Sequence, residues 1–338
     1  MIRTIGAPAE NLATFMRQRG HSPDELVQQV GDSFGEMSLV AAGGSVVVGY
    51  ANDRSDVDVY AVGAIPDTQG VPLVSHELGP LLDITLIDES SFRAELETLE
   101  SEPWLFRPGS ALAEKWRRKR RTLDHAIRIA SGVVLTAQPA WRGVHASLNA
   151  TFLAERAETW WRLEARRQLV AARWLGATNS RLTAQVCADA RLSALKAVAA
   201  RSGFLYLNRK WIATELSALA REDLLGEYRQ LMIDAWQATD AALPRAMQML
   251  ERLLGDPAEN HLVEVSYLPG VSLHAAGGRT LVTRWEMRSV LLDVTGLPRV
   301  RRGRLAIWTG RLDEDPPAAI IELVRSGMAW LGVCDGSN

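Results

Sequence analysis

A glycine-serine pair followed ten residues later by two aspartates is the part of this sequence best suited to chemistry. The pair is Gly44-Ser45, preceded by Gly43, and the aspartates are Asp56 and Asp58. Because glycine has no Cβ, its backbone can approach a phosphate closely, and the serine hydroxyl adds a donor. Neighbouring carboxylates repel unless a proton or cation lies between them, and Mg2+ prefers carboxylates together with phosphate oxygens. The pattern therefore predicts a site for a metal-bound phosphate.

An extended strand would place both aspartates on one face. Alternate side chains of a strand point the same way, so Asp56 and Asp58 would face one side while Val57 and Val59 point into a core. This alternation distinguishes the segment from two ordinary surface turns, the alternative reading of the glycines and aspartates.

A second predicted strand, residues 81–88, carries a third carboxylate. Its apolar residues alternate onto one face, which leaves Asp83 on the other. Those apolar residues are Leu82, Ile84 and Leu86. Asp88 falls at the end of the strand, where we expect it to cap a helix that begins near Ser90.

The spacing Gly-Ser, ten residues, Asp-x-Asp resembles the signature of the DNA polymerase beta superfamily, in particular its small bacterial nucleotidyltransferases. Members typically also have a glycine four residues after the serine and a serine just before the first aspartate, positions held here by Gly49 and Ser55. Many relatives have a basic residue directly after the serine, where this chain has Val46. The resemblance implies that two Mg2+ ions are held by three carboxylates, namely Asp56, Asp58 and Asp83, with the last nearest the attacking hydroxyl.

The resemblance also implies how a nucleoside triphosphate would bind. Gly44 and Ser45 would contact its phosphates, and a basic residue from an appended helical domain often reaches the triphosphate in such enzymes. Lys196 and Lys210 are the candidates here. For each of them the alternative is an ordinary solvated surface lysine.

The implied activity is transfer of a nucleoside monophosphate, AMP from ATP by family frequency, onto an acceptor hydroxyl with release of pyrophosphate. The leading acceptor is a small molecule such as an aminoglycoside-type compound, although acidic residues that would bind a polycation are not clearly clustered. The nearest approach is Glu95, Glu97, Glu100 and Glu102. Two alternatives remain: a protein or peptide hydroxyl as acceptor, and an inactive regulatory or nucleic-acid-binding protein.

Composition sets outer bounds on these interpretations. The chain has 338 residues, 47% of them hydrophobic, and a formal net charge of −2, which predicts a soluble protein of two or three domains. Cys187 and Cys334 have no paired spacing, and the histidines show no metal-ligand spacing. With no signal-like N-terminus and no long apolar run, we expect a cytoplasmic protein without a membrane partner. Walker, dinucleotide-binding and hydrolase motifs are also absent from the sequence.

The predicted fold class is α+β in three parts. Residues 1–90 would form a nucleotidyltransferase core, a short mixed sheet with helices on one side. Residues 91–256 would form a helical bundle that binds substrate, and residues 257–338 a small accessory region with the element order of a winged helix.

Local patterns predict individual elements within these parts. Two short helices are expected in 8–34, strands in 37–88 and only helices from 90 to 255. In the last part we expect strands at 262–267 and 272–282, a helix at 285–294, a strand at 304–309 and a helix at 317–330. Asn208 is expected to cap a helix that carries Ile212 and Leu216.

Cations and tryptophans are concentrated in the predicted helical part. The run Lys115–Arg121 contains six cations around Trp116. Because consecutive positions wrap around a helix, we favour a solvated face over a nucleic-acid groove, and nucleic acid is not expected as a partner. The tryptophans are expected to pack in the core. They are Trp104, Trp116, Trp160, Trp161, Trp174 and Trp211.

Overall fold

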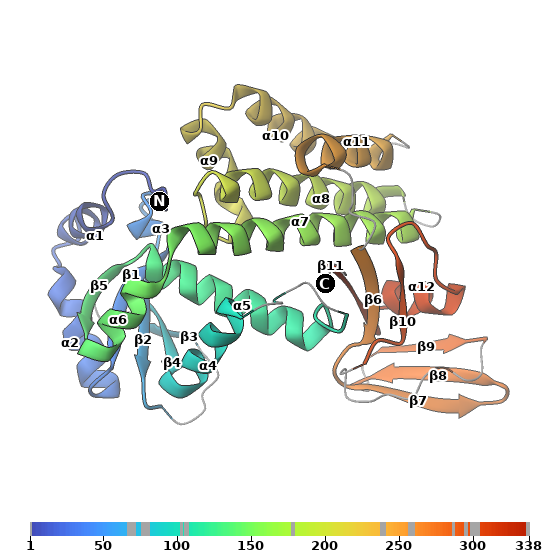
Figure 1. The fold of residues 1–338 in the computed structure, drawn as a ribbon, viewed down its shortest axis with the longest axis horizontal. Helices are drawn as coiled ribbons and strands as arrows, with labels where there is room; N and C mark the ends of the chain where they lie inside the picture. Colours follow the sequence, from blue (N-terminus) through green and yellow to red (C-terminus); the bar gives the residue numbers. More distant parts are fainter. Residues whose placement is uncertain are drawn as a thin grey trace. The chain divides into compact units, whose positions relative to one another are not determined.

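The chain folds into helices and small sheets, which confirms the α+β class (Figure 1). The structure is a computed structural model that describes residues 2–65, 72–75, 82–101, 104, 108–176, 180–236, 241–255, 261–285, 288–293, 297 and 305–335. Two compact units make up the chain, and each collects segments that are distant in sequence. Unit 1 comprises Met1–Glu100, Arg121–Glu158 and Ala199–Glu222, and unit 2 comprises Ser101–Arg120, Thr159–Val198 and Asp223–Asn338.

The longest helices lie between residues 113 and 201, and shorter ones are spread over the described parts of the chain. They are α1 Pro8–Arg17, α2 Pro23–Phe34, α3 Gly44–Val47, α4 Glu89–Glu100, α5 Ala113–Ala130, α6 Pro139–Ser147, α7 Ala150–Leu175, α8 Ser180–Arg201, α9 Ile212–Ala218, α10 Glu222–Asp234, α11 Ala242–Leu254 and α12 Ala318–Arg325. The two helices expected in 8–34 are confirmed as α1 and α2, and Asn208 caps a short 3-10 turn, Arg209–Trp211, directly before α9. Among the described residues, no helix is both long and apolar enough to cross a membrane.

Unit 1 is built on a mixed sheet. Within the described residues its strands lie in the order β3-β4-β2-β1-β5. β2 and β4 are parallel and the other neighbours antiparallel. The strands are β1 Leu39–Gly43, β2 Val57–Gly63, β3 Pro72–Ser75, β4 Leu82–Asp88 and β5 Val133–Ala137. β5 corrects the expectation that residues 90–255 would be only helical.

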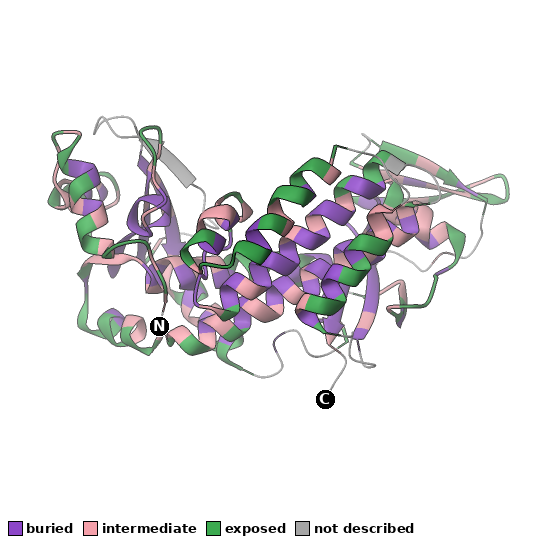
Figure 2. Cartoon of the chain, turned by 90° about the horizontal axis from the view of Figure 1, so that it is seen from above, coloured by how far each residue is buried: buried purple, intermediate pink, exposed green. Residues whose placement is uncertain are grey.

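Strand alternation decides which face of the sheet is apolar. Every second residue of β2 and β4 enters a buried core together with side chains of α1, α2 and α3. The predicted inward positions are confirmed by Val57 and Val59, both with 0% exposure. The central strands β1 and β2 are largely buried (Figure 2).

The opposite face of the sheet is also covered, which corrects the expectation of helices on one side. Tyr60 of β2 lies beside His125 of α5, with ring centroids 6.0 Å apart. Phe92 of α4 stacks on Trp141 of α6 at 6.0 Å. The sequence places α4, α5 and α6 in the helical bundle, whereas α4, α6 and the part of α5 from Arg121 onward belong to unit 1.

Unit 2 contains long helices and two small antiparallel sheets. Within the described residues the sheet orders are β10-β6-β11 and β7-β8-β9. The strands are β6 His261–Tyr267, β7 Val271–Ala276, β8 Arg279–Arg284, β9 Arg288–Leu292, β10 Trp308–Arg311 and β11 Ala329–Asp335. The predicted core tryptophans of unit 2 are buried, with Trp116 and Trp160 ring centroids 4.1 Å apart, whereas Trp236 and Trp285 are exposed. Trp211, which was also expected in the core, is only half-buried and belongs to unit 1.

Several predictions for the C-terminal region were wrong in detail. The helix expected at 285–294 is strand β9, because its backbone pairs with β8. The helix expected at 317–330 ends at Arg325, and β11 follows and pairs along β6. With strands in these places, the described residues do not have the element order of a winged helix. The strand expected at 304–309 lies at 308–311, and the linker expected at 256–260 lies outside the described residues.

Candidate active site

Two of the three predicted aspartates lie side by side. Asp58 of β2 and Asp83 of β4 are register partners in the parallel pair, so their side chains point to the same face of the sheet. This is the face opposite the apolar core, toward α5. Asp56 lies directly before β2 begins at Val57.

Gly44 lies against the Asp58 carboxylate. Its backbone is in the left-handed region at φ +75°, and a Cβ there would collide with Asp58 Oδ2. Gly49 has φ +84°, and a Cβ there would collide with the backbone oxygen of Ile5. The structure thus gives these glycines a packing reason that the sequence argument did not contain: one accommodates a candidate catalytic carboxylate, and the other the N-terminal segment.

Ser45 belongs to the short helix α3, which begins at Gly44. The residue is only 3% exposed, and its backbone oxygen accepts a hydrogen bond from Tyr50 N–H at 2.8 Å. The serine therefore forms part of the wall behind Gly44 and not an open loop tip.

Arg128 of α5 is a central residue of this site that the sequence analysis missed. Its Nη1 donates to Asp58 Oδ1 at 3.2 Å and to the Tyr60 hydroxyl at 2.7 Å. Its Nε lies 3.0 Å from Asp124 Oδ2, one turn earlier on the same helix. The guanidinium also stacks 4.9 Å from the centre of the Tyr206 ring. The available signal was a cation flanked by two isoleucines, with an aspartate four residues before it.

The carboxylates of the site are held in an unfavourable charged environment. Burial raises the pKa of Asp58 to about 6; Arg128 opposes this shift, and neighbouring aspartates, among them Asp83, add to it. The pKa of Asp83 is also raised, by burial and by the charge of Asp56. In addition, Asp83 Oδ1 is buried and has no hydrogen-bond partner among the described residues. A second cation near Asp58 and Asp83 would relieve this repulsion.

These residues fit a cation that is shared with a phosphate. Within the described residues, no three His, Cys, Asp or Glu side chains are grouped closely enough to form a complete protein cage for a metal. Mg2+ does not need such a cage, since it is commonly held by one or two carboxylates with water and substrate phosphates. Asp58 and Asp83 can supply that part, and the unpartnered Oδ1 of Asp83 is an available ligand atom.

The two candidate lysines lie in different units and different environments. Lys196 is in unit 2 and is fully buried, so the reading of it as a solvated surface lysine is wrong. Lys210 is exposed in unit 1, and its Nζ lies 4.9 Å from the centre of the Trp211 ring. The role of either lysine at a triphosphate stays a prediction.

Other predicted polar residues have local structural tasks. Asp88 Oδ2 accepts hydrogen bonds from Ser91 N–H at 2.8 Å and Ser90 Oγ at 2.7 Å, which confirms it as the cap of α4. Glu95 accepts from Thr122 at 2.8 Å and lies 3.5 Å from Arg121. Glu97 and Glu100 are exposed on α4, and Glu102 lies outside the described residues.

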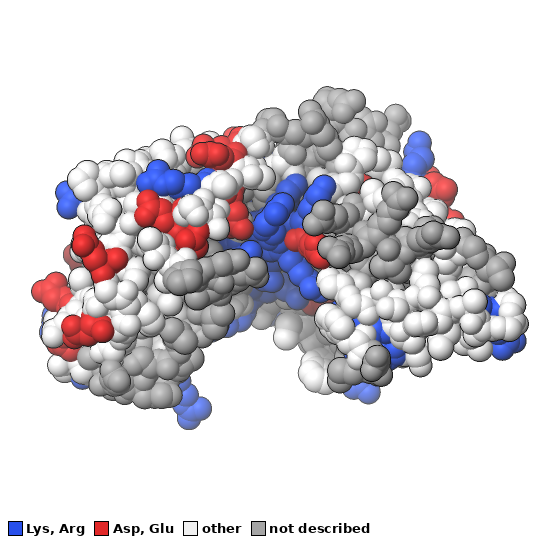
Figure 3. Space-filling view, turned by 90° about the horizontal axis from the view of Figure 1, so that it is seen from below, with Lys and Arg blue, Asp and Glu red and all other residues white. Residues whose placement is uncertain are grey.

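The basic run on α5 wraps around its helix as expected. Trp116 is buried, whereas the four arginines that follow it in the run are exposed and Lys119 is half-buried. Figure 3 shows groups of Lys and Arg side chains at the surface of the face that it draws. The charges therefore do not all face one ligand.

Comparison with known proteins finds structural similarity but no relative by sequence. No protein-family model matches the sequence. No curated protein matches it either. Among solved structures, a nucleotidyltransferase-like protein from Exiguobacterium sibiricum is similar at 13% sequence identity, over 69% of this chain and 76% of that chain, with a TM-score of 0.40. A similarity at this level does not support any inference about the function of this chain. The interpretation of the site therefore rests on the geometry of Asp58, Asp83 and Gly44.

Proposed function

We propose that this protein is a metal-dependent nucleotidyltransferase that moves a nucleoside monophosphate from a nucleoside triphosphate to an acceptor hydroxyl. The observation that carries the proposal is the pairing of Asp58 and Asp83 on parallel strands beside Gly44, with one buried carboxylate oxygen left without a partner. The sequence signature supports the same reading, and family frequency favours ATP, hence AMP transfer. Mg2+, as two ions, would supply charge neutralisation of the phosphates and of the acceptor oxygen.

Each residue of the site has a definable task in this reaction. Asp58, together with Asp56, would hold the triphosphate end through the cation, and Arg128 fixes the orientation of the Asp58 carboxylate through Oδ1. Asp83 would lie nearest the acceptor, with Oδ1 on the cation, and its other carboxylate oxygen would take the proton of the acceptor hydroxyl. The acceptor oxygen then forms the new bond to the α-phosphorus, and the bond to the pyrophosphate oxygen breaks. Gly44 and Ser45 would line the phosphate side of the site.

The acceptor is proposed to be a small hydroxylated molecule. An aminoglycoside-type polycation would need carboxylates that are free to bind it. The acidic residues of α4 supply fewer of these than their number suggests, because Glu95 already accepts from Thr122 and pairs with Arg121. A protein or peptide hydroxyl is the alternative acceptor. An inactive regulatory protein is disfavoured, because a site without chemistry would gain nothing from half-buried carboxylates that repel each other.

Transfer from α-labelled triphosphates, with and without Mg2+, tests the proposal directly. Candidate acceptors and the protein itself would be analysed by intact mass for an added nucleoside monophosphate, and pyrophosphate would be measured as co-product. Asp58→Asn and Asp83→Asn are each expected to lower turnover at least about a hundredfold, the scale seen for groups that stabilise transition-state charge. The matched control is Asp53→Asn, an exposed aspartate in the preceding loop. Folded Asn variants with wild-type turnover would refute the assignment.

A further inference from the structure

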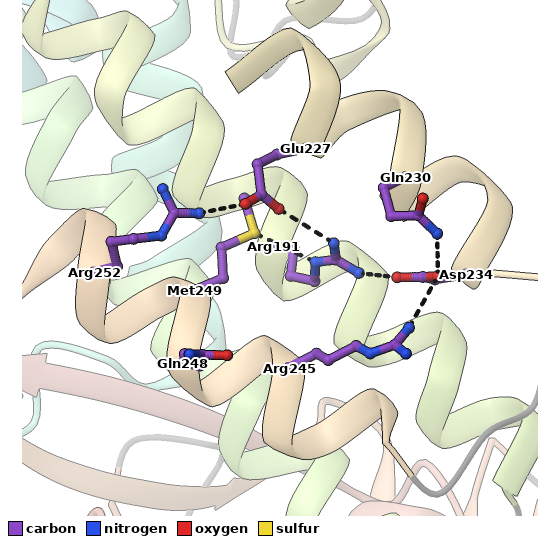
Figure 4. Close-up of a pocket in the computed structure, with 8 residues that line it drawn as sticks. All are labelled: Arg191, Glu227, Gln230, Asp234, Arg245, Gln248, Met249 and Arg252. Atoms are coloured by element: carbon purple, nitrogen blue, oxygen red, sulfur yellow. Dashed lines mark hydrogen bonds and ion pairs between the residues drawn. The ribbon is translucent and has the colours of Figure 1, made fainter. Parts of the chain in front are cut away.

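A charged cavity lies within unit 2, between helices α8, α10 and α11 (Figure 4). Its volume is about 520 Å3, within the range of small-molecule sites. On α10 and on α11 the lining polar residues recur at i, i+3 and i+7, so each helix presents one polar stripe to the cavity. The stripes are Glu227, Gln230 and Asp234 on α10, and Arg245, Gln248 and Arg252 on α11.

A buried arginine from α8 forms the inner wall of the cavity. The Arg191 side chain is 6% exposed, and its Nη1 lies 2.6 Å from Asp234 Oδ2. Its Nη2 lies 3.6 Å from Glu227 Oε2, and its Nε donates to Met249 Sδ at 3.3 Å. Arg191 and Asp234 therefore form an ion pair that is largely shielded from solvent and has no net charge. The net charge of the cavity then depends on the residues nearer the solvent, which form its outer wall.

The outer wall carries a surplus of positive charge. Arg252 Nη2 lies 2.5 Å from Glu227 Oε1, which neutralises that carboxylate. Arg245 Nη1 lies 3.3 Å from Asp234 Oδ1, an oxygen that already accepts from Gln230 at 2.9 Å. Because Arg191 already neutralises the charge of Asp234, the positive charge of Arg245 has no negative charge to balance it. Figure 4 shows Gln248 between Arg245 and Arg252 on α11.

Helix packing alone does not account for this arrangement. The outer arginine side chains are 54% and 48% exposed, and ion pairs at such exposure contribute little to stability. Burial of the Arg191 guanidinium has a desolvation cost that a hydrophobic side chain would avoid. What the arrangement does achieve is orientation, since fixed carboxylates hold three guanidinium groups around one open cavity.

We propose that this cavity binds a small phosphate-bearing anion through Arg245, Gln248 and Arg252. A guanidinium offers five N–H donors and each outer arginine spends few of them on its carboxylate, while the Gln248 amide adds two more. This number of donors exceeds what the two oxygens of a carboxylate require and suits the terminal oxygens of a phosphate. The site is independent of the proposed transferase chemistry, because all its residues belong to unit 2 and none of them is a candidate catalytic residue.

Calorimetric titration of the full chain with inorganic phosphate and with pyrophosphate tests the proposal. The buffer contains EDTA, so that the aspartate site of unit 1 cannot take up either anion through a divalent cation. Arg245→Gln removes the surplus charge, and Arg229→Gln is the matched control, because Arg229 is an exposed arginine of α10 that does not line the cavity. Gln248→Glu places a carboxylate beside Arg245 and serves as a second, independent variant.

The expected result is saturable binding in the wild type, weakened at least about tenfold in Arg245→Gln and in Gln248→Glu, as for loss of a charge-assisted contact, and unchanged in Arg229→Gln. Circular dichroism melts confirm that each variant is folded. No saturable binding by the wild type up to about 10 mM of either anion, far weaker than a millimolar site, would overturn the proposal. Equal weakening in Arg229→Gln would also overturn it, since the attraction would then be general to the charged surface.

Discussion

Each unit of this protein buries an arginine between two carboxylates, and the two clusters differ in what surrounds them. In unit 1, Arg128 lies 3.2 Å from Asp58 and 3.0 Å from Asp124. In unit 2, Arg191 lies 2.6 Å from Asp234 and 3.6 Å from Glu227. Both central guanidinium groups are almost withdrawn from solvent, so neither cluster is an ordinary surface ion pair.

The neighbours of the two pairs have opposite signs. Around Arg128 the additional groups are carboxylates, Asp56 and Asp83, and burial together with the charge of Asp56 raises the pKa of Asp83. Around Arg191 the additional groups are guanidiniums, Arg245 and Arg252. The same buried motif thus leaves a negative surplus in one unit, suited to a metal cation, and a positive surplus in the other, suited to an anion. Net charge near zero for the whole chain conceals both.

Substitution of Arg128 or Arg191 should give the largest losses of stability, and the response of each variant to Mg2+ should distinguish the two clusters. Arg128→Met removes the guanidinium partner of Asp58 and Asp124 and should lose about 3–5 kcal/mol of unfolding free energy in metal-free buffer. Arg191→Met should lose less, because Asp234 and Glu227 keep their pairs with Arg245 and Arg252. Mg2+ should restore part of the loss in Arg128→Met, because the carboxylates of unit 1 can share it. Chemical unfolding with MgCl2, against NaCl of equal ionic strength, measures this. Equal recovery of both variants would contradict the difference between the clusters.

Gly44→Ala should disturb the unit 1 cluster from the opposite side. The new Cβ would collide with Asp58 Oδ2, so the carboxylate must move, and we expect turnover to fall at least tenfold, the rough scale for misplacement of a reacting group. Gly20→Ala is the control, because Gly20 has the same left-handed backbone at φ +80° and open space around its Cβ position. Both variants should share about 1–2 kcal/mol of backbone strain. Equal turnover in the two would show that strain alone matters.

Acidification should reveal the raised pKa of Asp58. Below its folded-state pKa of about 6 the carboxyl is protonated and cannot hold a cation, so kcat/KM should fall up to tenfold per pH unit there. Between the unfolded and folded pKa values the folded protein binds more protons than the unfolded one, so metal-free stability should decrease as pH rises through this window. Asp58→Asn should weaken the stability trend to the part that the raised pKa of Asp83 leaves, which melts at several pH values would detect.

Substitution of the two candidate lysines should give the smallest effects, and the two variants should differ in whether stability changes. Lys210→Met removes an exposed charge outside both clusters and should change stability by no more than about 0.5 kcal/mol. If its Nζ contacts the triphosphate, the KM for the triphosphate rises as well. Lys196→Met alters a fully buried side chain, so any effect of that change should appear first in the melting curve. Steady-state kinetics and melts on both variants would distinguish these outcomes.

Several elements were predictable because the signal was local. Alternation fixed the inward faces of β2 and β4, and Asp88 was identified as a helix cap from its position alone. Other local signals were present and overlooked. Gly132 precedes the β-branched run that forms β5, and Gly327, at φ +72°, ends α12 before β11 begins.

Elsewhere the local signal was ambiguous. The apolar residues around Val290 suit a short strand or a helix equally well, because a run of that length has no decisive period. Pairing with β8 decides for the strand, since it satisfies the backbone hydrogen bonds of β9. Only the tertiary arrangement supplies that partner.

The sequence by itself determined the α+β class, the strands that carry the aspartates, and the faces on which Asp58 and Asp83 lie, because alternation and glycine placement are properties of short segments. Only the tertiary structure decided that those aspartates are register partners, that Gly44 packs against Asp58, and that Arg128 reaches Asp58 from α5. It alone also gathered Arg191, Arg245 and Arg252 around one cavity. These relations join residues distant in the chain, and the charge at each site depends on which side chains the fold brings within a few ångströms.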